Sequence, residues 1–246
     1  FFIFLEYLNN ILSQLIYYIF RKIMKDKLLK RWISAGLKKD DNILLHSSFK
    51  RTLTELSNEN YKVSIQDLLD SFLDLISPNG TIVFPTFNFD FTNKIKYDYY
   101  KTTSQMGAIT ELARNHKLAQ RTLNPVYSFA AFGKKSNLFD SIDNINWYAK
   151  DSPLSIIHKL NFKICIIDLR DRNSMTFAHY CEEFFQVPWR YYKRFSGNYV
   201  DKEKNTSIKT CVGYVRKINE GIETTLDPAG ELMWEKKIYK GSKPFE

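Results

Sequence analysis

A histidine and a glutamate in the stretch "TFAHYCEE" (176–183) have the types and spacing needed for acid–base chemistry. His179 and Glu182 are three residues apart, and side chains with this spacing project from one face of an α-helix. A neutral imidazole accepts protons near neutral pH, and a neighbouring carboxylate can orient the ring. The spacing alone leaves three interpretations open: an acid–base pair, half of a metal site, or an ordinary helix surface.

The sequence around this pair predicts strands that alternate with helices. Apolar and β-branched runs predict strands, and apolar residues at helical spacing predict helices. Ser64 and Ser104 are candidate helix caps, and Pro153 lies in the first turn of a helix, a favoured place for proline. The order indicates one α/β domain with a mixed central sheet and helices on both faces. The expected strands are 42–49, 81–89, 128–133 and 162–169, with further strand-like pieces after residue 197, and the expected helices are 64–77, 104–116, 152–160 and 176–185.

Polar turns follow three of these predicted strands. Ligands of open α/β sheets bind at the carboxyl ends of the strands. If the three strands are parallel neighbours, the polar residues of the turns converge on one cleft. The segment 90–103 has no clean period and is the predicted mobile active-site loop. The converging side chains would be His46, Ser47, Ser48, Asp90, His179 and Glu182.

Composition limits the partners of the chain. The net charge of +9 and the pI near 9.2 favour anionic partners. Nucleic acid is the least favoured of these, because the chain has no RNP-like motif, zinc-finger spacing or long basic block. Three widely spaced cysteines argue against a disulfide framework and indicate reduced thiols in a cytoplasmic protein. The four histidines form no close ligand pair, so no metal is expected.

The N-terminal stretch is strongly apolar and carries a polar stripe, which is costly for a single span exposed to lipid. Basic residues follow it at 21–31. Residues 1–27 are therefore predicted to form an amphipathic helix that precedes a domain over 28–246. Two interpretations stay open: peripheral binding to an anionic leaflet at the inner membrane surface, or packing against a second subunit of a homo-oligomer.

Six motifs occur in an order and spacing that resemble the aminoglycoside 3-N-acetyltransferase family. This family uses acetyl-CoA and differs in fold from the GNAT acetyltransferases. The resemblance covers about residues 28–200, most of the chain. Its motifs are "HSSFK" (46–50), "GTIVFPTFNFD" (80–90), "SQMGAITELAR" (104–114), "RTLNPVYSFAAFG" (121–133), "DSPLSIIHKL" (151–160) and "MTFAHYCEE" (175–183).

The resemblance implies direct transfer of an acetyl group from acetyl-CoA to an amine, without an acyl-enzyme. The histidine that matches His179 is then the general base, and Glu182 fixes its tautomer and stabilises the imidazolium. The "HSSFK" turn resembles a CoA-binding turn, and "SQMGAI" would place a helix N-terminus beside the cofactor. The expected cofactor-binding residues are His46, Ser47, Ser48, Lys50, Ser104, Met106, Gly107 and Ala108, and the expected substrate-binding residues are Asp90, Asn124 and Tyr127.

The chain departs from the family pattern at three places. Many relatives have His-Pro where this chain has Asn124 and Pro125, and they tend to have glycine where it has Asp168 and Leu169. Lys50 stands where relatives often carry arginine, which keeps the charge but loses the bidentate fork. The first two changes affect the acceptor pocket and leave His179 in place.

Three hypotheses for the function follow. The first is an N-acetyltransferase for a nucleotide- or lipid-linked amino sugar of surface-glycan biosynthesis, because the basic charge suits phosphates and the motif sequences resemble those members. The second is an aminoglycoside-inactivating enzyme, and the third is an inactive relative that serves as a scaffold subunit. "KGSKPFE" has no obvious last element, and family members commonly continue, so truncation at Glu246 is also expected.

Overall fold

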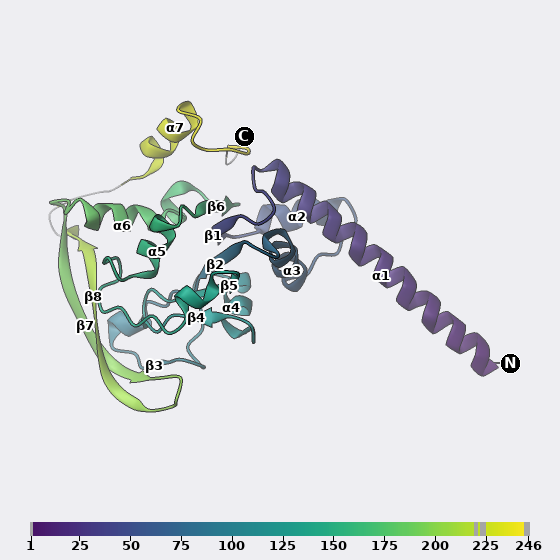
Figure 1. Cartoon of the computed structure of the whole chain (residues 1–246), viewed down its shortest axis with the longest axis horizontal. Coiled ribbons are helices and arrows are strands. Elements are labelled where there is room, and N and C mark those ends of the chain that lie inside the picture. The colour runs from purple at the N-terminus through teal and green to yellow at the C-terminus, as the bar shows by residue number, and fades with distance from the viewer. Residues whose placement is uncertain (1, 219–220, 222–224, 244–246) are drawn as a thin grey trace.

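The computed structural model of this 246-residue chain describes residues 2–218, 221 and 225–243, and gives side chains from Asn10 onward except Tyr17. Two β-sheets with surrounding helices form the body, and the first helix projects away from it (Figure 1). The expected truncation at Glu246 falls outside the described residues.

A five-stranded sheet with the strand order β4-β5-β2-β1-β6 lies at the centre of the body. β1 pairs in parallel with β2 on one side and with β6 on the other. β5 pairs antiparallel with both β2 and β4. The predicted mixed sheet is therefore confirmed. Its strands are β1 (Asn42–Ser47), β2 (Thr81–Pro85), β4 (Gln120–Arg121), β5 (Phe129–Gly133) and β6 (Lys163–Ile167).

Helices cover both faces of this sheet, as the sequence predicts. Leu45 of β1 belongs to one core, which the first four helices share. Leu44 belongs to the opposite core, which the next two helices share with a second sheet, because successive residues of a strand point to opposite faces. The helices are α1 (Phe2–Ser34), α2 (Lys50–Asn58), α3 (Ile65–Ile76), α4 (Ala108–Asn115), α5 (Pro153–Lys159), α6 (Thr176–Phe184) and α7 (Asp227–Glu235), with 3₁₀ turns η1 (Asp90–Asn93), η2 (Ser136–Phe139) and η3 (Asp171–Asn173).

The predicted helix starts are confirmed at Ser64 and Pro153 but not at Ser104. Ser64 Oγ accepts the Asp67 backbone N–H at 3.1 Å, and the Asp67 carboxylate accepts the Ser64 N–H at 2.9 Å, which makes a capping box. Pro153 is the first residue of α5. α4 begins only after Gly107, which has φ 111°, a conformation that glycine adopts without steric cost.

The second sheet has the order β3-β7-β8 and includes a long antiparallel hairpin. Its strands are β3 (Tyr97–Asp98), β7 (Arg190–Val200) and β8 (Thr206–Arg216). The segment 90–103 was expected to be a mobile loop, but it contributes β3, which pairs in parallel with β7. Tyr97 is buried and stacks on Tyr199 with 5.3 Å between ring centroids. Contacts with residues far away in the sequence hold this segment in place, and its local pattern could not show them.

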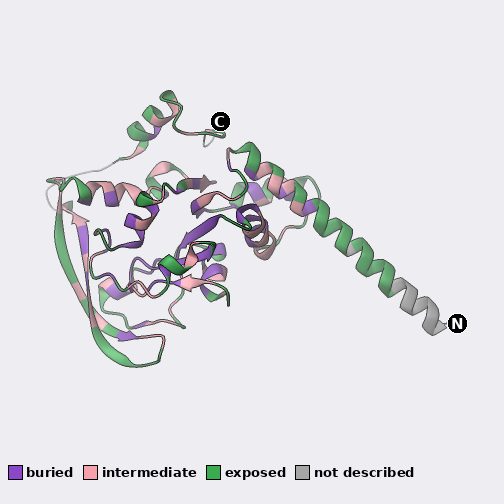
Figure 2. Cartoon of the chain, in the orientation of Figure 1, coloured by how far each residue is buried: buried purple, intermediate pink, exposed green. Residues whose placement is uncertain are grey.

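α1 is one continuous helix that crosses the predicted boundary at residue 27. Its C-terminal part is packed into the body: Leu28 and Trp32 are buried, and Trp32 stacks on Phe72 of α3 at 4.7 Å between ring centroids. The part before it projects from the body (Figure 1), and its described side chains between residues 10 and 23 are exposed (Figure 2). The exposed large apolar side chains of this outer part are Ile11, Leu12, Leu15, Ile16, Tyr18, Ile19, Phe20 and Ile23.

Ion pairs attach the base of α1 to α2 and α3. Arg21 Nη2 lies 2.6 Å from Asp67 Oδ1, and Lys25 pairs with Asp74. Arg31 pairs with Glu55 of α2, and Lys27 pairs with Glu59 directly after that helix. Much of the basic run at 21–31 is thus used inside the molecule. Among the described residues, no helix is both long enough and apolar enough to cross a membrane.

Candidate active site

The turns that carry the predicted site follow parallel, neighbouring strands. β2, β1 and β6 lie side by side and run in the same direction, so their carboxyl ends share one edge of the sheet. The Ser48 backbone N–H donates to the Ile167 carbonyl at 3.0 Å and joins the turn after β1 to the end of β6. The sequence predicted that the three turns converge if their strands are parallel neighbours, and the strands meet this condition.

His179 and Glu182 touch on the surface of α6. His179 Nδ1 lies 2.9 Å from Glu182 Oε2, as the three-residue spacing on a helix predicts. The two side chains are 32% and 17% exposed, so both are sheltered while the imidazole keeps access to solvent. The contact uses Nδ1, so it does not involve the other ring nitrogen, Nε2.

Two side chains complete this cluster, Trp189 directly before β7 and Arg190 at its first position, and the sequence alone predicted neither. The Trp189 indole N–H donates to Glu182 Oε1 at 3.0 Å. Arg190 Nη2 lies 2.7 Å from Glu182 Oε2 and 2.9 Å from His179 Nδ1. Glu182 therefore has a partner at each oxygen, and a permanent positive charge stands beside the imidazole.

The partners of Glu182 determine its charge. Burial by itself raises the pKa of Glu182, but hydrogen bonds from His179, Trp189 and Arg190 and the guanidinium charge outweigh it and lower this pKa from 4.5 to about 2. Glu182 is thus a carboxylate throughout the neutral range. Arg190 is only 8% exposed, and its Nη1 donates to the Tyr214 carbonyl at 2.9 Å, so the hairpin holds the cation in place.

Aromatic rings connect the acid–base pair with the turn after β2. The ring centroids of Tyr148 and His179 are 5.7 Å apart, and those of Tyr127 and Tyr148 are 5.1 Å apart. Tyr127 also contacts Phe89 at 5.7 Å. Burial raises the pKa of Tyr127 and of Tyr148 above the usual value, so both phenols stay neutral. Tyr127, a predicted substrate-binding residue, is thus connected to His179 through the ring of Tyr148.

The last residues of β1 supply buried polar atoms at the sheet edge. His46 is 5% exposed and Ser47 is 9% exposed. Their Nε2 and Oγ atoms find no hydrogen-bond partner among the described residues. Burial lowers the pKa of His46 to about 4, so its imidazole is neutral at physiological pH. Cofactor binding by these residues stays a prediction.

A carboxylate already binds the N-terminus of α2, the helix that follows the turn after β1. Ser48 and Lys50 are exposed, and Phe49 between them has φ 58°. The Asp168 carboxylate accepts the Thr52 backbone N–H of α2 at 2.7 Å. Asp168, which stands where relatives tend to have glycine, therefore occupies one N–H donor in the first turn of α2.

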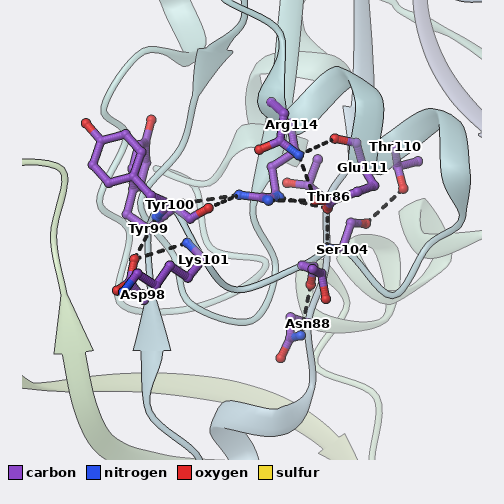
Figure 3. A network of polar contacts seen from close by, with 12 residues as sticks. Thr86, Asn88, Asp98, Tyr99, Tyr100, Lys101, Ser104, Thr110, Glu111 and Arg114 are labelled. Carbon is purple, nitrogen blue, oxygen red and sulfur yellow. Dashed lines mark hydrogen bonds and ion pairs between the residues drawn. The ribbon is translucent and has the colours of Figure 1, made fainter. Parts of the chain in front are cut away.

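The start of α4 is held by a polar network that includes Ser104 (Figure 3). Ser104 Oγ lies 2.8 Å from Thr110 Oγ1, and the Ser104 N–H donates to Glu111 Oε2 at 2.7 Å. The Met106 N–H donates to Ser104 Oγ at 3.1 Å. A Cβ built on Gly107 would meet nothing within 4 Å, and Ala108 beside it is exposed, so this backbone borders open space.

Asp90 and Asn124 are engaged within the protein. Asp90 Oδ1 accepts the Gln105 side-chain amide at 2.9 Å, which ties the turn after β2 to the turn before α4. Asn124 is fully buried. Its Oδ1 accepts the N–H groups of Val126 and Tyr127, each at 3.0 Å, and its amide donates to the Asn144 carbonyl at 2.9 Å. This arrangement gives Asn124 a role in shaping the loop and does not favour the predicted contact with substrate.

A family model described as aminoglycoside 3-N-acetyltransferase matches residues 44–241. A curated relative, the SPbeta prophage-derived aminoglycoside N(3')-acetyltransferase-like protein YokD of Bacillus subtilis (strain 168), is 24% identical over 180 residues. That match covers 64% of this chain and 63% of the relative, so the chain spans less than two thirds of the relative's length.

Solved structures share this fold at low sequence identity. Aminoglycoside acetyltransferase AAC(3)-Xa has a TM-score of 0.71 at 18% identity, with coverage of 87% of this chain and 82% of that one. YokD has 0.67 at 21%, covering 88% and 89%. AAC-IIIb in a binary complex with CoASH has 0.66 at 17%, covering 78% and 75%. Because the family model spans most of its length, this chain belongs to the aminoglycoside 3-N-acetyltransferase family.

Proposed function

We propose that the protein is an acetyl-CoA-dependent N-acetyltransferase that acts on an amine of an aminoglycoside-type amino sugar. The observation that carries this proposal is the cluster of His179, Glu182 and Arg190. Glu182 is kept ionised at the Nδ1 side of the imidazole, and a hydrogen bond to it from Nδ1–H leaves the Nε2 lone pair available as a base. The family model and the relatives support this class of reaction.

The reaction needs one proton acceptor at the amine. As the amine nitrogen bonds to the acetyl carbonyl carbon and the C–S bond breaks, that nitrogen must lose a proton. His179 Nε2 takes it, and Glu182 Oε2, 2.9 Å from Nδ1, stabilises the imidazolium that forms. General-base help of this kind contributes about 10²–10⁴-fold in rate. The Trp189 indole N–H binds the other oxygen of Glu182 and so keeps the carboxylate oriented toward the imidazole.

The edge of the sheet fits acetyl-CoA as the co-substrate. The unpaired buried atoms His46 Nε2 and Ser47 Oγ can receive polar groups of pantetheine, and the open side of Gly107 allows a close approach to the backbone. Ser48 and Lys50 are exposed at the turn and can contact a phosphate. When bound, acetyl-CoA supplies the acetyl thioester. A related structure is described as binding CoASH.

The comparisons favour an aminoglycoside over a glycan precursor as the acceptor. AAC(3)-Xa is described as an aminoglycoside acetyltransferase and YokD as an aminoglycoside N(3')-acetyltransferase-like protein, and two structures of AAC-VIa are described with bound sisomicin. The glycan hypothesis relied on the net charge of +9. Several of these cations pair with acids at the base of α1 and do not line the acid–base cluster. The charge is therefore a weak objection to a polycationic substrate.

An acceptor panel tests the proposed function. CoA release from acetyl-CoA is followed with aminoglycosides and with nucleotide-linked amino sugars, with His179→Gln as the matched inactive control. We expect release with aminoglycosides only. Release with nucleotide-linked sugars alone would restore the glycan hypothesis. If neither class is acetylated by folded protein that still binds acetyl-CoA, the chain is an inactive relative.

We also propose that the outer part of α1 packs against the same helix of a second copy. Leu12, Leu15 and Ile19 are exposed and follow the alternating three- and four-residue spacing of helices that pair. Arg21, Lys25, Lys27 and Arg31 are engaged with acids of α2 and α3. These ion pairs weaken the case for an anionic leaflet, which needs free cations next to the apolar stretch.

A further inference from the structure

Two groups compete for one nitrogen of His179. Glu182 Oε2 and Arg190 Nη2 each lie 2.9 Å from Nδ1, and they lie 2.7 Å from one another. The three atoms therefore form a closed triangle. Nδ1 cannot serve both partners in the same way, because a carboxylate only accepts a hydrogen bond and a guanidinium only donates one.

Each partner requires a different tautomer. A hydrogen bond to Glu182 needs the proton on Nδ1, which leaves the Nε2 lone pair free to act as a base. A hydrogen bond from Arg190 needs the lone pair on Nδ1, which places the proton on Nε2 and removes the base from the substrate side. The imidazolium carries a proton on each nitrogen. Its Nδ1–H can donate to Glu182, but Arg190 then has no lone pair on Nδ1 to donate to.

The surroundings leave Arg190 in control of this balance. Its Nη1 donates to the Tyr214 carbonyl at 2.9 Å, and the side chain is 8% exposed. The guanidinium therefore cannot move away without breaking this hydrogen bond. The other groups that face the imidazole are Glu182 on its own helix and Tyr148 from the loop before α5. Tyr148 is a neutral phenol, because burial raises its pKa.

We propose that Arg190 is a positioning residue that competes with Glu182 for Nδ1 of His179 and so influences which ring nitrogen carries the proton. The guanidinium donates to the same carboxylate oxygen that the imidazolium needs and repels the imidazolium charge. The charge of Arg190 thus opposes the positive charge on the ring that the carboxylate of Glu182 favours. Arg190 also populates the tautomer with the proton on Nε2, which must convert before the amine can lose its proton. The link to catalysis rests on the proposed function, whereas the protonation of the ring does not.

Nitrogen-15 NMR of the imidazoles tests this inference without substrate. The His179 signals are assigned by their loss in His179→Gln, and their pH titration is followed in the parent protein, Arg190→Met and Arg190→Lys. Methionine removes the charge and the donors but keeps an unbranched stem. Arg194→Met on the same strand is the matched control, because Arg194 is exposed.

Arg190→Met should move the midpoint of the His179 titration up by about one pH unit, because a cation within hydrogen-bond distance is lost. It should also shift the neutral ring toward the tautomer with the proton on Nδ1. Arg190→Lys should keep most of the parent midpoint, and the control should leave it unchanged. An unchanged or lower midpoint in folded Arg190→Met overturns the inference, as does a matching rise in the control.

Activity separates this inference from the proposed function. If the enzyme is active, the acid limb of its pH–rate profile should follow the NMR midpoint upward in Arg190→Met. If no acceptor is acetylated but the NMR midpoint rises as expected, the proposed function fails and the role of Arg190 stands. If acetylation proceeds and its acid limb stays fixed in Arg190→Met, the role of Arg190 is wrong.

Discussion

Asp168 and Thr52 are joined across the edge of the sheet: the Asp168 carboxylate accepts the Thr52 backbone N–H at 2.7 Å. An acceptor from the end of β6 thus serves the first turn of α2, where a capping side chain usually serves its own helix. Asp168 has φ 56°, a left-handed conformation that is commoner for Asn and Gly than for other residues.

Asp168→Ala should lower the free energy of unfolding by about 1 kcal/mol, because the helix loses its acceptor. Asp168→Asn keeps an acceptor oxygen and tolerates the backbone conformation, so it should lose less. The same Asn variant removes a negative charge beside the turn that carries Lys50 and should bind acetyl-CoA more tightly. Urea unfolding and calorimetric titration measure the two effects. Weaker acetyl-CoA binding by the Asn variant would place the phosphates elsewhere.

His179→Gln should lower kcat by about a hundredfold or more, because the amine loses its proton acceptor. Affinity for acetyl-CoA should be nearly unchanged, since His179 is not among the residues expected to hold it. In the parent enzyme the rate should fall as the pH drops, because imidazolium cannot accept a proton. His116→Gln, at the C-terminal end of α4, is the control, and full activity in His179→Gln contradicts the proposed base.

Glu182→Gln should cost less activity than the loss of His179, because the shape and one acceptor oxygen remain. The acid limb of the pH–rate profile of this variant should move to lower pH. A paired carboxylate stabilises the imidazolium, so loss of the carboxylate makes protonation of His179 harder. Initial rates between pH 5 and pH 8 at saturating acetyl-CoA measure the shift. An upward or absent shift leaves His179 as the base and removes Glu182 from the mechanism.

His46 should make stability depend on pH. Burial lowers the pKa of His46 from 6.5 to about 4, so between these values the unfolded chain binds a proton that the folded chain does not. Stability should therefore fall as the pH drops from 6.5 toward 4, by up to about 3 kcal/mol. Thermal unfolding in this range measures it. His46→Leu should flatten this part of the curve, and an equal slope in both proteins would exclude His46 as the cause.

Removal of residues 1–20 tests the contact made by α1. The truncation keeps Leu28 and Trp32 in the core and the ion pair of Arg21 with Asp67, so the unfolding temperature should change little. The full chain should be a dimer by light scattering, and the truncated chain a monomer with unchanged kcat. If the full chain is a monomer that binds anionic liposomes and the truncation does not, the helix is a membrane contact instead.

The sequence by itself predicted the features that depend on local pattern. Alternating runs indicated the α/β layers with a mixed sheet, because burial and helical spacing leave a period in the chain. Ser64 and Pro153 marked helix starts through the chemistry of single residues. The contact of His179 with Glu182 followed from helix geometry, since both residues belong to one turn. Six motifs in order indicated the family, which the family model confirms.

The tertiary structure decided everything that required two distant segments to meet. Trp189 and Arg190 are close to Glu182 in sequence, but they reach it only because the turn between α6 and β7 reverses the chain, and the sequence carries no periodic signal of that contact. Asp168 meets Thr52 across 116 residues of chain. The basic residues of α1 looked free in the sequence, but pairing with α2 and α3 uses several of them. Local sequence sets the chemistry of each side chain, and only packing decides which charges and donors share a site.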